Sequence, residues 1–544
     1  MAEAIFPPAV MGAATLQRRP AALATLCTVL FLTFLDTTIV SVALANIQTT
    51  LHAGVAELQW VVTAYALTFA SAMLVFGMIG DQFGRKKVML IGVGVYCFGA
   101  LLSALSQTIA PSAAIAVLIA GRAVMGLGAA ASEPGTLSML RHLYTEERSR
   151  NRALGVWAAV SGFSLALGPV LGGALVGVWS WRGIFWFDVA FGLVALAAAA
   201  HFLPENSDHD ARRVDVSGGV FGAAALGTLI FAVIDAENSG FASAGVLALL
   251  CISAVSAGAF VWREAQAEHP LLDLRFLRVP KFATPNVVAF CTYFATFAIF
   301  FFTALYLSEV AGYNGYHIAE VFLPMTALMI IASLLAGRWT GVVGVRWSLV
   351  AGCVTFAAGL LLTNTVLGPH PGYLPVAAAL ALTGIGIGIC VVPITSSVLG
   401  AVPAERSGMA ASVTNTSREV GAVMGVAILG ALVNGQLHSE LSARLTHLGI
   451  PLTFQSIVIQ ALETGGVPAN GNSSSQAPAG EGKLVQEVIN AAYSAFQSGL
   501  HDALYLSAGL MTGAALLALV TLRGRAEPVT PQPSALPPAE AIAT

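Results

Sequence analysis

The stretch GMIGDQFGRKK, from Gly77 to Lys87, separates two long apolar runs at 58–80 and 86–106. Gly77 and Gly84 permit a close helix–helix approach and a sharp turn, because glycine carries no β-carbon. Its last three residues are all basic, which is typical of a cytoplasmic connection between membrane-spanning helices. The stretch therefore predicts a short turn between two transmembrane helices.

Apolar runs of the same kind recur along the whole chain. Of its 544 residues, 57% are hydrophobic and 10% are charged, whereas a soluble domain carries about 25% charged residues. A helix that crosses a bilayer needs about 20 apolar residues. We therefore expect an all-α membrane protein with fourteen transmembrane helices, near 22–46, 58–80, 86–106, 112–140, 150–177, 183–203, 215–235, 242–262, 284–309, 318–340, 347–367, 373–399, 408–432 and 503–523.

The distribution of basic residues supports this number of helices. If the N-terminus is cytoplasmic and the chain alternates sides, the cytoplasmic segments hold 20 of the 25 basic residues, as the positive-inside rule requires. Both termini are then cytoplasmic. The first run is too long for a signal peptide and carries an acidic residue at its centre. Arginine outnumbers lysine 21 to 4, which is typical of a GC-rich bacterial genome, so we expect the bacterial plasma (inner) membrane.

Three polar stretches interrupt the pattern. Residues 204–214 read as a cytoplasmic linker, and 524–544 as a disordered Pro-rich tail. Residues 433–502 are predicted to form a long external loop with short amphipathic helices. This loop is either a flexible connector or a docking element. All six cysteines lie within apolar runs without metal-ligand spacing, so we expect buried small hydrophobic residues and no metal site.

A few charged residues fall inside the predicted helices. A charge in the hydrocarbon region is costly, and those that persist usually line a cavity and take part in function. All ten histidines lie in loops or near helix ends, so carboxylates would have to carry any protons. The candidates for proton coupling are Asp36, Arg122, Glu133, Asp188, Arg418 and Glu419.

The spacing on the fourth helix brings two of these charges to one face. Arg122 and Glu133 are eleven residues apart, which is about three turns and about 16 Å along a helix. Glycines beside Arg122 permit another helix to approach. A contact between Asp36 and Arg122 that differs between conformations would change the proton affinity of Asp36, with Arg122 as the tuning group. The alternative is a static ion pair that fixes the first and fourth helices.

Two motifs carry a resemblance to a known family. GMIGDQFGRKK resembles the signature loop of the major facilitator superfamily, which acts there as a cytoplasmic latch between two halves. LGPVLGGAL in the fifth helix resembles that family's antiporter motif, which marks exporters, although Ser164 replaces an upstream glycine. Its proline would bend the helix, and its glycines would form a flat face. The gating residues implied are Gly77, Asp81, Gly84, Arg85, Lys86, Gly168, Pro169, Gly172 and Gly173.

Further segments are similar to the fourteen-helix drug:proton antiporter branch of that family. They are LDTTIVSVALANI in the first helix, RAVMGLGAA in the fourth, WSWRGIFWFDVAFG at 179–192 and SREVGAVMGVAILG at 417–430. Ser41 and Ala45 replace the branch's usual Asn and Pro, Asp188 stands where Asn is usual, and Glu419 replaces Gln. These acidic departures either add proton or cation sites or place the protein outside the best-known drug exporters.

The resemblance implies a major facilitator fold that works by alternating access. We expect a six-helix bundle at 1–203, a linker with two inserted helices at 204–283, and a second six-helix bundle at 284–523. The implied function is proton-coupled export of lipophilic, often cationic small molecules such as drugs, within the lipid bilayer. Export of an endogenous lipid, siderophore or antibiotic is the alternative.

Other classes of protein are less well supported. No GxSxG, HExxH or phosphate-binding GxxxxGK[ST] motif occurs, so we expect neither an enzyme nor a cofactor, and no nucleic-acid partner. A channel rarely needs a paired latch loop. The sequence leaves open a periplasmic adaptor protein. Aromatic residues of the second, fifth and ninth helices are candidates for an adaptable substrate cavity: Trp60, Tyr65, Phe163, Phe301, Phe302 and Tyr306.

Overall fold

The computed structural model describes residues 13–53, 55–205, 216–267, 270, 272–311, 313, 315–368, 371–403, 406–447 and 481–522. Within these ranges the regular structure is helical. The N-terminal half comprises α1 (Ala13–Ile39), η1 (Val40–Ala43), α2 (Leu44–Leu51), α3 (Val55–Phe83), α4 (Arg85–Ile109), η2 (Pro111–Ala113), α5 (Ala114–Leu143), α6 (Glu147–Val178) and α7 (Arg182–Phe202).

The remaining helices follow the linker. The inserted pair is α8 (Val216–Ser239) and α9 (Ala244–Gln266), and the short η3 (Phe276–Arg278) precedes the next bundle. The C-terminal half comprises α10 (Pro280–Glu309), α11 (Gly315–Val343), α12 (Val345–Val366), α13 (Tyr373–Gly400), α14 (Ser407–His447) and α16 (Glu481–Thr521).

The fourteen predicted spans are present. Among the described residues, thirteen helices are long and apolar enough to cross a bilayer, and the two pieces of α6, bent by 44° between Leu165 and Val170, make the fourteenth. The first span is shorter than predicted, because regular α-helix ends at Ile39 and gives way to η1. Threonine and serine hydroxyls here bond back to the backbone, as Ser41 Oγ does to Thr38 O at 2.6 Å, which competes with regular helix geometry.

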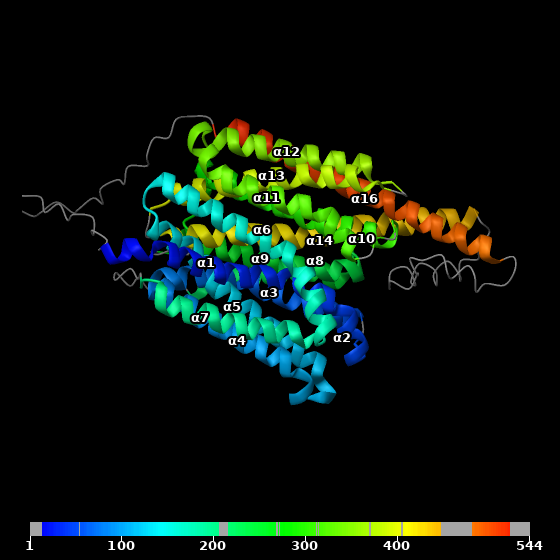
Figure 1. Ribbon diagram of the computed structural model, residues 1–544, viewed down its shortest axis with the longest axis horizontal. Coiled ribbons are helices and arrows are strands. Elements are labelled where there is room, and N and C mark those ends of the chain that lie inside the picture. The colour runs from blue at the N-terminus through cyan, green and yellow to red at the C-terminus, as the bar shows by residue number, and fades with distance from the viewer. Residues whose placement is uncertain are drawn as a thin grey trace, which may run out of the picture.

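The two halves lie side by side with their helices along the long axis (Figure 1). They meet along α3 and α14 and along α6 and α11, while α8 packs on α3 and α14 beside this seam. At the end of the bundle where Asp81 lies, hereafter the Asp81 end, the contact is close: Gly155 lies against Ser333, and Gly337 lies against Asn151. A side chain larger than glycine has no room at either position.

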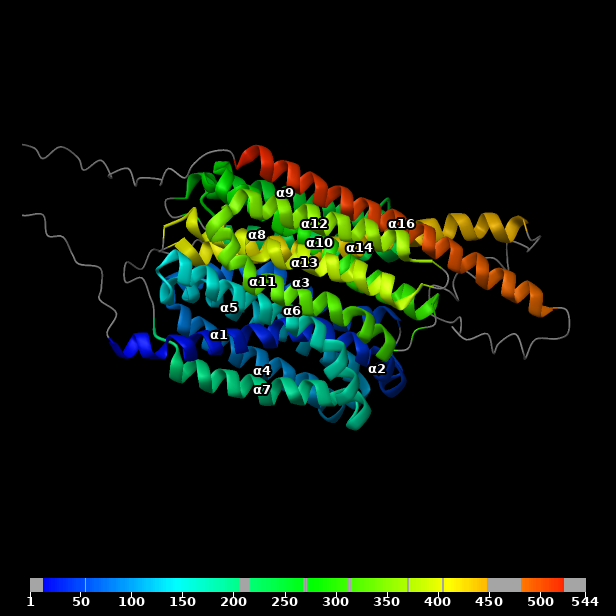
Figure 2. The same ribbon diagram turned by 45° about the horizontal axis from the view of Figure 1, so that its top comes forward.

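The predicted external loop at 433–502 is largely helical where the structure describes it. Helix α14 continues to His447 and α16 begins at Glu481, and the two project together beyond the bundle (Figure 2). Leu441 and Leu445, one helical turn apart, are fully buried. Apolar packing therefore stabilises helix in this part of the predicted loop. Residues 448–480, most of the 204–214 linker and the 524–544 tail lie outside the described residues.

The cysteines differ in part from the prediction. Five are buried, but Cys251 on α9 is exposed, because α9 is covered on little of its surface by the rest of the protein. Cys353 and Cys390 approach each other, with their Sγ atoms 3.9 Å apart. Among the described residues, no three His, Cys, Asp or Glu side chains are grouped to hold a metal.

Candidate functional site

The first buried charge cluster joins Asp36 on α1 to Arg122 on α5. One terminal nitrogen of Arg122 donates to both carboxylate oxygens of Asp36, at 2.7 and 2.6 Å. Arg122 Nε donates to Val61 O at 2.9 Å, and the guanidinium lies 4.6 Å from the centre of the Tyr65 ring. Both charged side chains are at most 1% exposed. The contact predicted from the sequence is present, and it lies wholly within the N-terminal half.

Glycines on α5 position this pair. Gly121 and Gly128 lie against the backbone of α4, Gly121 also against the Ser103 hydroxyl, and Gly126 lies against the carbonyl of Tyr65 on α3. Helix α5 can therefore approach both neighbours closely, as its small residues predicted. Arg122 is thereby held in a buried layer between these helices.

Asp188 on α7 lies beside this pair. It is fully buried, and neither of its carboxylate oxygens has a hydrogen-bond partner among the described residues. Asp36, Arg122 and Tyr96 are its electrostatic neighbours. The hydroxyl of Tyr96 is likewise buried without a partner of good geometry in the described structure.

The second cluster surrounds Arg418 on α14. Its guanidinium donates to Thr395 Oγ1 at 2.8 Å and to Asn415 Oδ1 at 3.1 Å. It also lies over the rings of Trp157 and Tyr293, 5.3 and 5.5 Å from their centres. Trp157 belongs to α6 and is itself held by a hydrogen bond from Nε1 to Thr136 Oγ1 at 3.2 Å. This cluster therefore spans the two halves.

Two carboxylates accompany Arg418 without forming an ion pair within 4.0 Å in the described part of the chain. Glu133 on α5 and Glu419 on α14 both interact electrostatically with Arg418, and they are 1% and 7% exposed. Tyr65 is electrostatically coupled to the acids of both clusters and so lies between them. The structure thus divides Arg122 and Glu133, which share one helix face, between two clusters.

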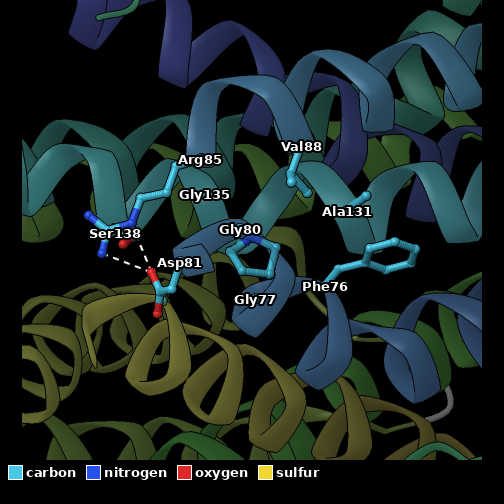
Figure 3. A pocket seen from close by; sticks show the side chains of 11 residues that line it. Phe76, Gly77, Gly80, Asp81, Arg85, Val88, Ala131, Gly135 and Ser138 are labelled. Carbon is cyan, nitrogen blue, oxygen red and sulfur yellow. Dashed lines mark hydrogen bonds and ion pairs between the residues drawn. The ribbon is translucent and has the colours of Figure 1, made fainter. Parts of the chain in front are cut away.

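At the Asp81 end a polar network connects the halves, and Figure 3 shows its central pair, Asp81 and Arg85. Arg85 pairs with Asp81 at 2.8 Å and donates to Ser407 Oγ at 2.9 Å. Asp81 accepts a hydrogen bond from the backbone N–H of Met409 at 3.1 Å. It thereby caps the first turn of α14, where a carboxylate is favoured by the unpaired N–H groups and the helix dipole.

Other predicted gating residues have distinct places around this network. Gly77 lies against Ser412 of α14, and Gly84 turns the chain with a φ of 104°. Lys86 instead donates to Ala200 O at the end of α7, within its own half, at 2.7 Å. Beside Asp81 and Gly77 is a small cavity of about 10 Å³, which is room for about one water molecule.

The glycines of the fifth-span motif face α1. Gly168 lies against Thr38, and Gly172 lies against Ile39, while Thr38 Oγ1 donates to Leu165 O at 2.9 Å. Gly173 is exposed, and the side chain of Pro169 is outside the described part. The bend of α6 falls within this motif.

The six aromatic candidates are not brought together. Tyr65 belongs to the first cluster, and Trp60 packs on Phe231 of α8 with ring centres 5.4 Å apart. Phe302 and Tyr306 are in the core of the C-terminal half, whereas Phe163 and Phe301 are about half exposed.

Sequence reasoning missed the neutral members of both clusters, Tyr96, Trp157, Tyr293, Thr395 and Asn415. Asn415 carried a signal, because it lies three residues from Arg418 and so on the same helix face. The three aromatic residues stand in apolar runs, where core packing is their usual role.

Comparisons with known proteins agree with this architecture. A family model described as Major Facilitator Superfamily matches residues 26–426. The chain is 34% identical over 416 residues to the multidrug resistance protein Stp of Mycobacterium tuberculosis, covering 76% of each chain. It is 28% identical over 507 residues to the tetracenomycin C resistance and export protein of Streptomyces glaucescens, covering 92% of this chain and 91% of that protein.

A solved structure shares the fold. The human organic anion transporter MFSD10 (TETRAN) superposes with a TM-score of 0.60 at 14% sequence identity, covering 93% of this chain and all of that chain. At this identity the likeness concerns the fold alone.

Proposed function

The chain belongs to the major facilitator superfamily, and from that premise we propose that it exports lipophilic, often cationic small molecules in exchange for protons. The names of its relatives, which include multidrug resistance and antibiotic export proteins, support drug-like substrates. The observation that carries proton coupling is the buried, hydrogen-bonded ion pair of Asp36 and Arg122.

The pair supplies a proton-binding site that depends on conformation. While Arg122 holds both oxygens of Asp36, its positive charge and hydrogen bonds favour the ionised carboxylate over the protonated acid. Separating the two side chains leaves a buried carboxylate, which is far less costly when it binds a proton. Conformations that form and break this contact therefore bind and release a proton in turn.

The network at the Asp81 end supplies the gate. Asp81 and Arg85 bind α14, and Arg141 donates to Val402 O at 2.8 Å. All three are contacts between the halves, so opening this end requires that they break. With the Asp81 end facing the cytoplasm, as the basic loops predict, this conformation is closed toward the cytoplasm. We place the protein in a bacterial plasma membrane with both termini cytoplasmic.

The test is transport by purified protein in liposomes with an imposed pH gradient, followed with a lipophilic cationic dye. We expect Asp36→Asn to abolish uphill, gradient-driven transport while dye binding and monodispersity in detergent persist. Asp235→Asn on α8 is the matched control, because it removes a carboxylate outside both clusters, and it should retain transport. Uphill transport by Asp36→Asn at the unmodified rate would overturn the proposal.

A further inference from the structure

Asp188 is a buried acid that has no counter-charge of its own beside the Asp36–Arg122 pair. It is fully buried, and both of its carboxylate oxygens lack a hydrogen-bond partner among the described residues. The neighbouring cation, Arg122, already directs a terminal nitrogen to Asp36 and Nε to Val61 O. Two acids therefore stand beside one arginine, and only one of them is neutralised.

Helix packing places Asp188 at the level of Asp36. Gly192 of α7 lies against Leu32 of α1 and Cys97 of α4, and α1 and α7 run in opposite directions (Figure 1). Asp188 precedes Gly192 by one turn and Asp36 follows Leu32 by about one turn, so both lie on the same side of this contact. Tyr96 adjoins Cys97 and interacts electrostatically with both carboxyls.

These neighbours define the surroundings of Asp188. In the described structure, the charged or titratable groups that act on it from the packed helices are Asp36 on α1, Tyr96 and Cys97 on α4, and Arg122 on α5. A carboxylate buried without a counter-charge or hydrogen bonds is strongly disfavoured, and in practice it becomes neutral by binding a proton.

We propose that Asp188 is a second proton-binding site, filled while Asp36 is paired with Arg122, and that the Tyr96 hydroxyl connects the two carboxyls. This inference rests on the proposed function, since it adds a site to the same exchange. The branch that the sequence resembles usually has Asn at this position, and an Asn side chain could not bind this proton.

The connection balances in protons and charge. The Asp188 carboxyl gives its proton to the Tyr96 oxygen as the Tyr96 hydroxyl gives its own to an Asp36 oxygen. Asp36 becomes neutral and releases Arg122, and Asp188 becomes the carboxylate that Arg122 can pair with. No proton is gained or lost inside the cluster, but the partner of Arg122 changes. A further proton from solvent then fills the second acid.

Infrared spectroscopy of the purified, full-length protein tests the site without any transport. At neutral pH we expect a protonated-carboxyl C=O band that Asp188→Asn removes and Asp235→Asn retains. Tyr96→Phe should keep this band but shift it, because its hydroxyl neighbour is gone. A spectrum that loses no protonated-carboxyl band in Asp188→Asn would overturn the proposal even if Asp36 proves to couple transport.

Transport in liposomes then tests the role. We expect Asp188→Asn to exchange one proton fewer per substrate than the unmodified protein, measured with a pH dye and a labelled substrate together. Tyr96→Phe should slow gradient-driven exchange several-fold while the number of protons exchanged per substrate stays the same. If Asp188→Asn does not fold, Tyr96→Phe still tests the proposed connection. An unchanged ratio in Asp188→Asn, or an unchanged rate in Tyr96→Phe, would contradict the second site or the connection respectively.

Discussion

The positive charges of the two buried arginines, Arg122 and Arg418, are stabilised in different ways. Arg122 has an ion-paired carboxylate, and its partners on α1 and α3 belong to its own half. Arg418 is held by neutral groups and by the ring of Trp157 across the seam. The first arrangement breaks only when helices shift within the N-terminal half, whereas the second is taken apart when the two halves separate. The first is thus suited to bind and release a proton as its own half rearranges, and the second to respond to the separation of the halves.

Breaking the ion pair should have the largest effect. Arg122→Met leaves Asp36 buried without its partner, and removing one member of a buried pair costs about 3–5 kcal/mol. Thermal unfolding in detergent should show this loss, and Arg122→Met with Asp36→Asn should regain part of it. Arg278→Met, at an exposed position, is the control. A loss no greater than that of the control would mean that the pair does not stabilise the fold.

Arg418→Met should cost less, because no carboxylate within ion-pair distance is left unpaired among the described residues. The loss of charge-assisted hydrogen bonds to Thr395 and Asn415 is worth about 1.5–3 kcal/mol. A double-mutant cycle with Trp157→Leu should give a coupling of about 0.5–2 kcal/mol from the cation–π contact. Unfolding measurements on the two single variants and the double variant supply the cycle. A coupling of zero would remove Trp157 from the cluster.

Glu419→Gln tests whether the second cluster responds to conformation. Closing the Asp81 end buries two acids beside one arginine, and the amide removes part of that cost. We expect the closed state to gain about 1 kcal/mol, roughly a fivefold change in the ratio of closed to open molecules. Spin labels at cysteines replacing Arg148 and Arg338, in a background without native cysteines, report the separation of α6 and α11. Equal distance distributions with and without the substitution would contradict this expectation.

The smallest effect is expected for a charge cluster outside the spans. Burial alone would raise the pKa of Asp273, but hydrogen bonds and charge from Arg275 and hydrogen bonding from Arg406 outweigh it and lower the pKa. A lowered pKa stabilises the fold above the unfolded-state value, about 4, and this contribution is lost as the pH falls further. Asp273→Asn should therefore cost about 0.5–1 kcal/mol at neutral pH. The difference in Tm from the unmodified protein should close in acid, and a constant difference would argue against the ion pairs.

The spans and the first pair could be predicted from the sequence because a bilayer leaves few alternatives. Charges such as Asp36 and Arg122 stand out against apolar runs, and a buried pair is the least costly arrangement for them. The second cluster could not be predicted, because Trp157 and Tyr293 stand in apolar runs, where an aromatic residue usually packs in the core. Only the tertiary structure shows that both rings contact Arg418. Helical spacing placed Glu133 on the face of Arg122, but a separation of about three turns was enough to give it different partners. The distribution of the aromatic candidates likewise depends on tertiary packing alone.

The glycine seam between α6 and α1 has an electrical consequence. Gly168 and Gly172 bring the backbone of α6 onto Thr38 and Ile39, directly after Asp36. Such close packing narrows the space for water on this side of Asp36, so we expect protons not to reach the carboxyl between these two helices. Gly168→Ala, which forces Thr38 aside, should loosen this packing and let protons cross down their gradient without transport of substrate.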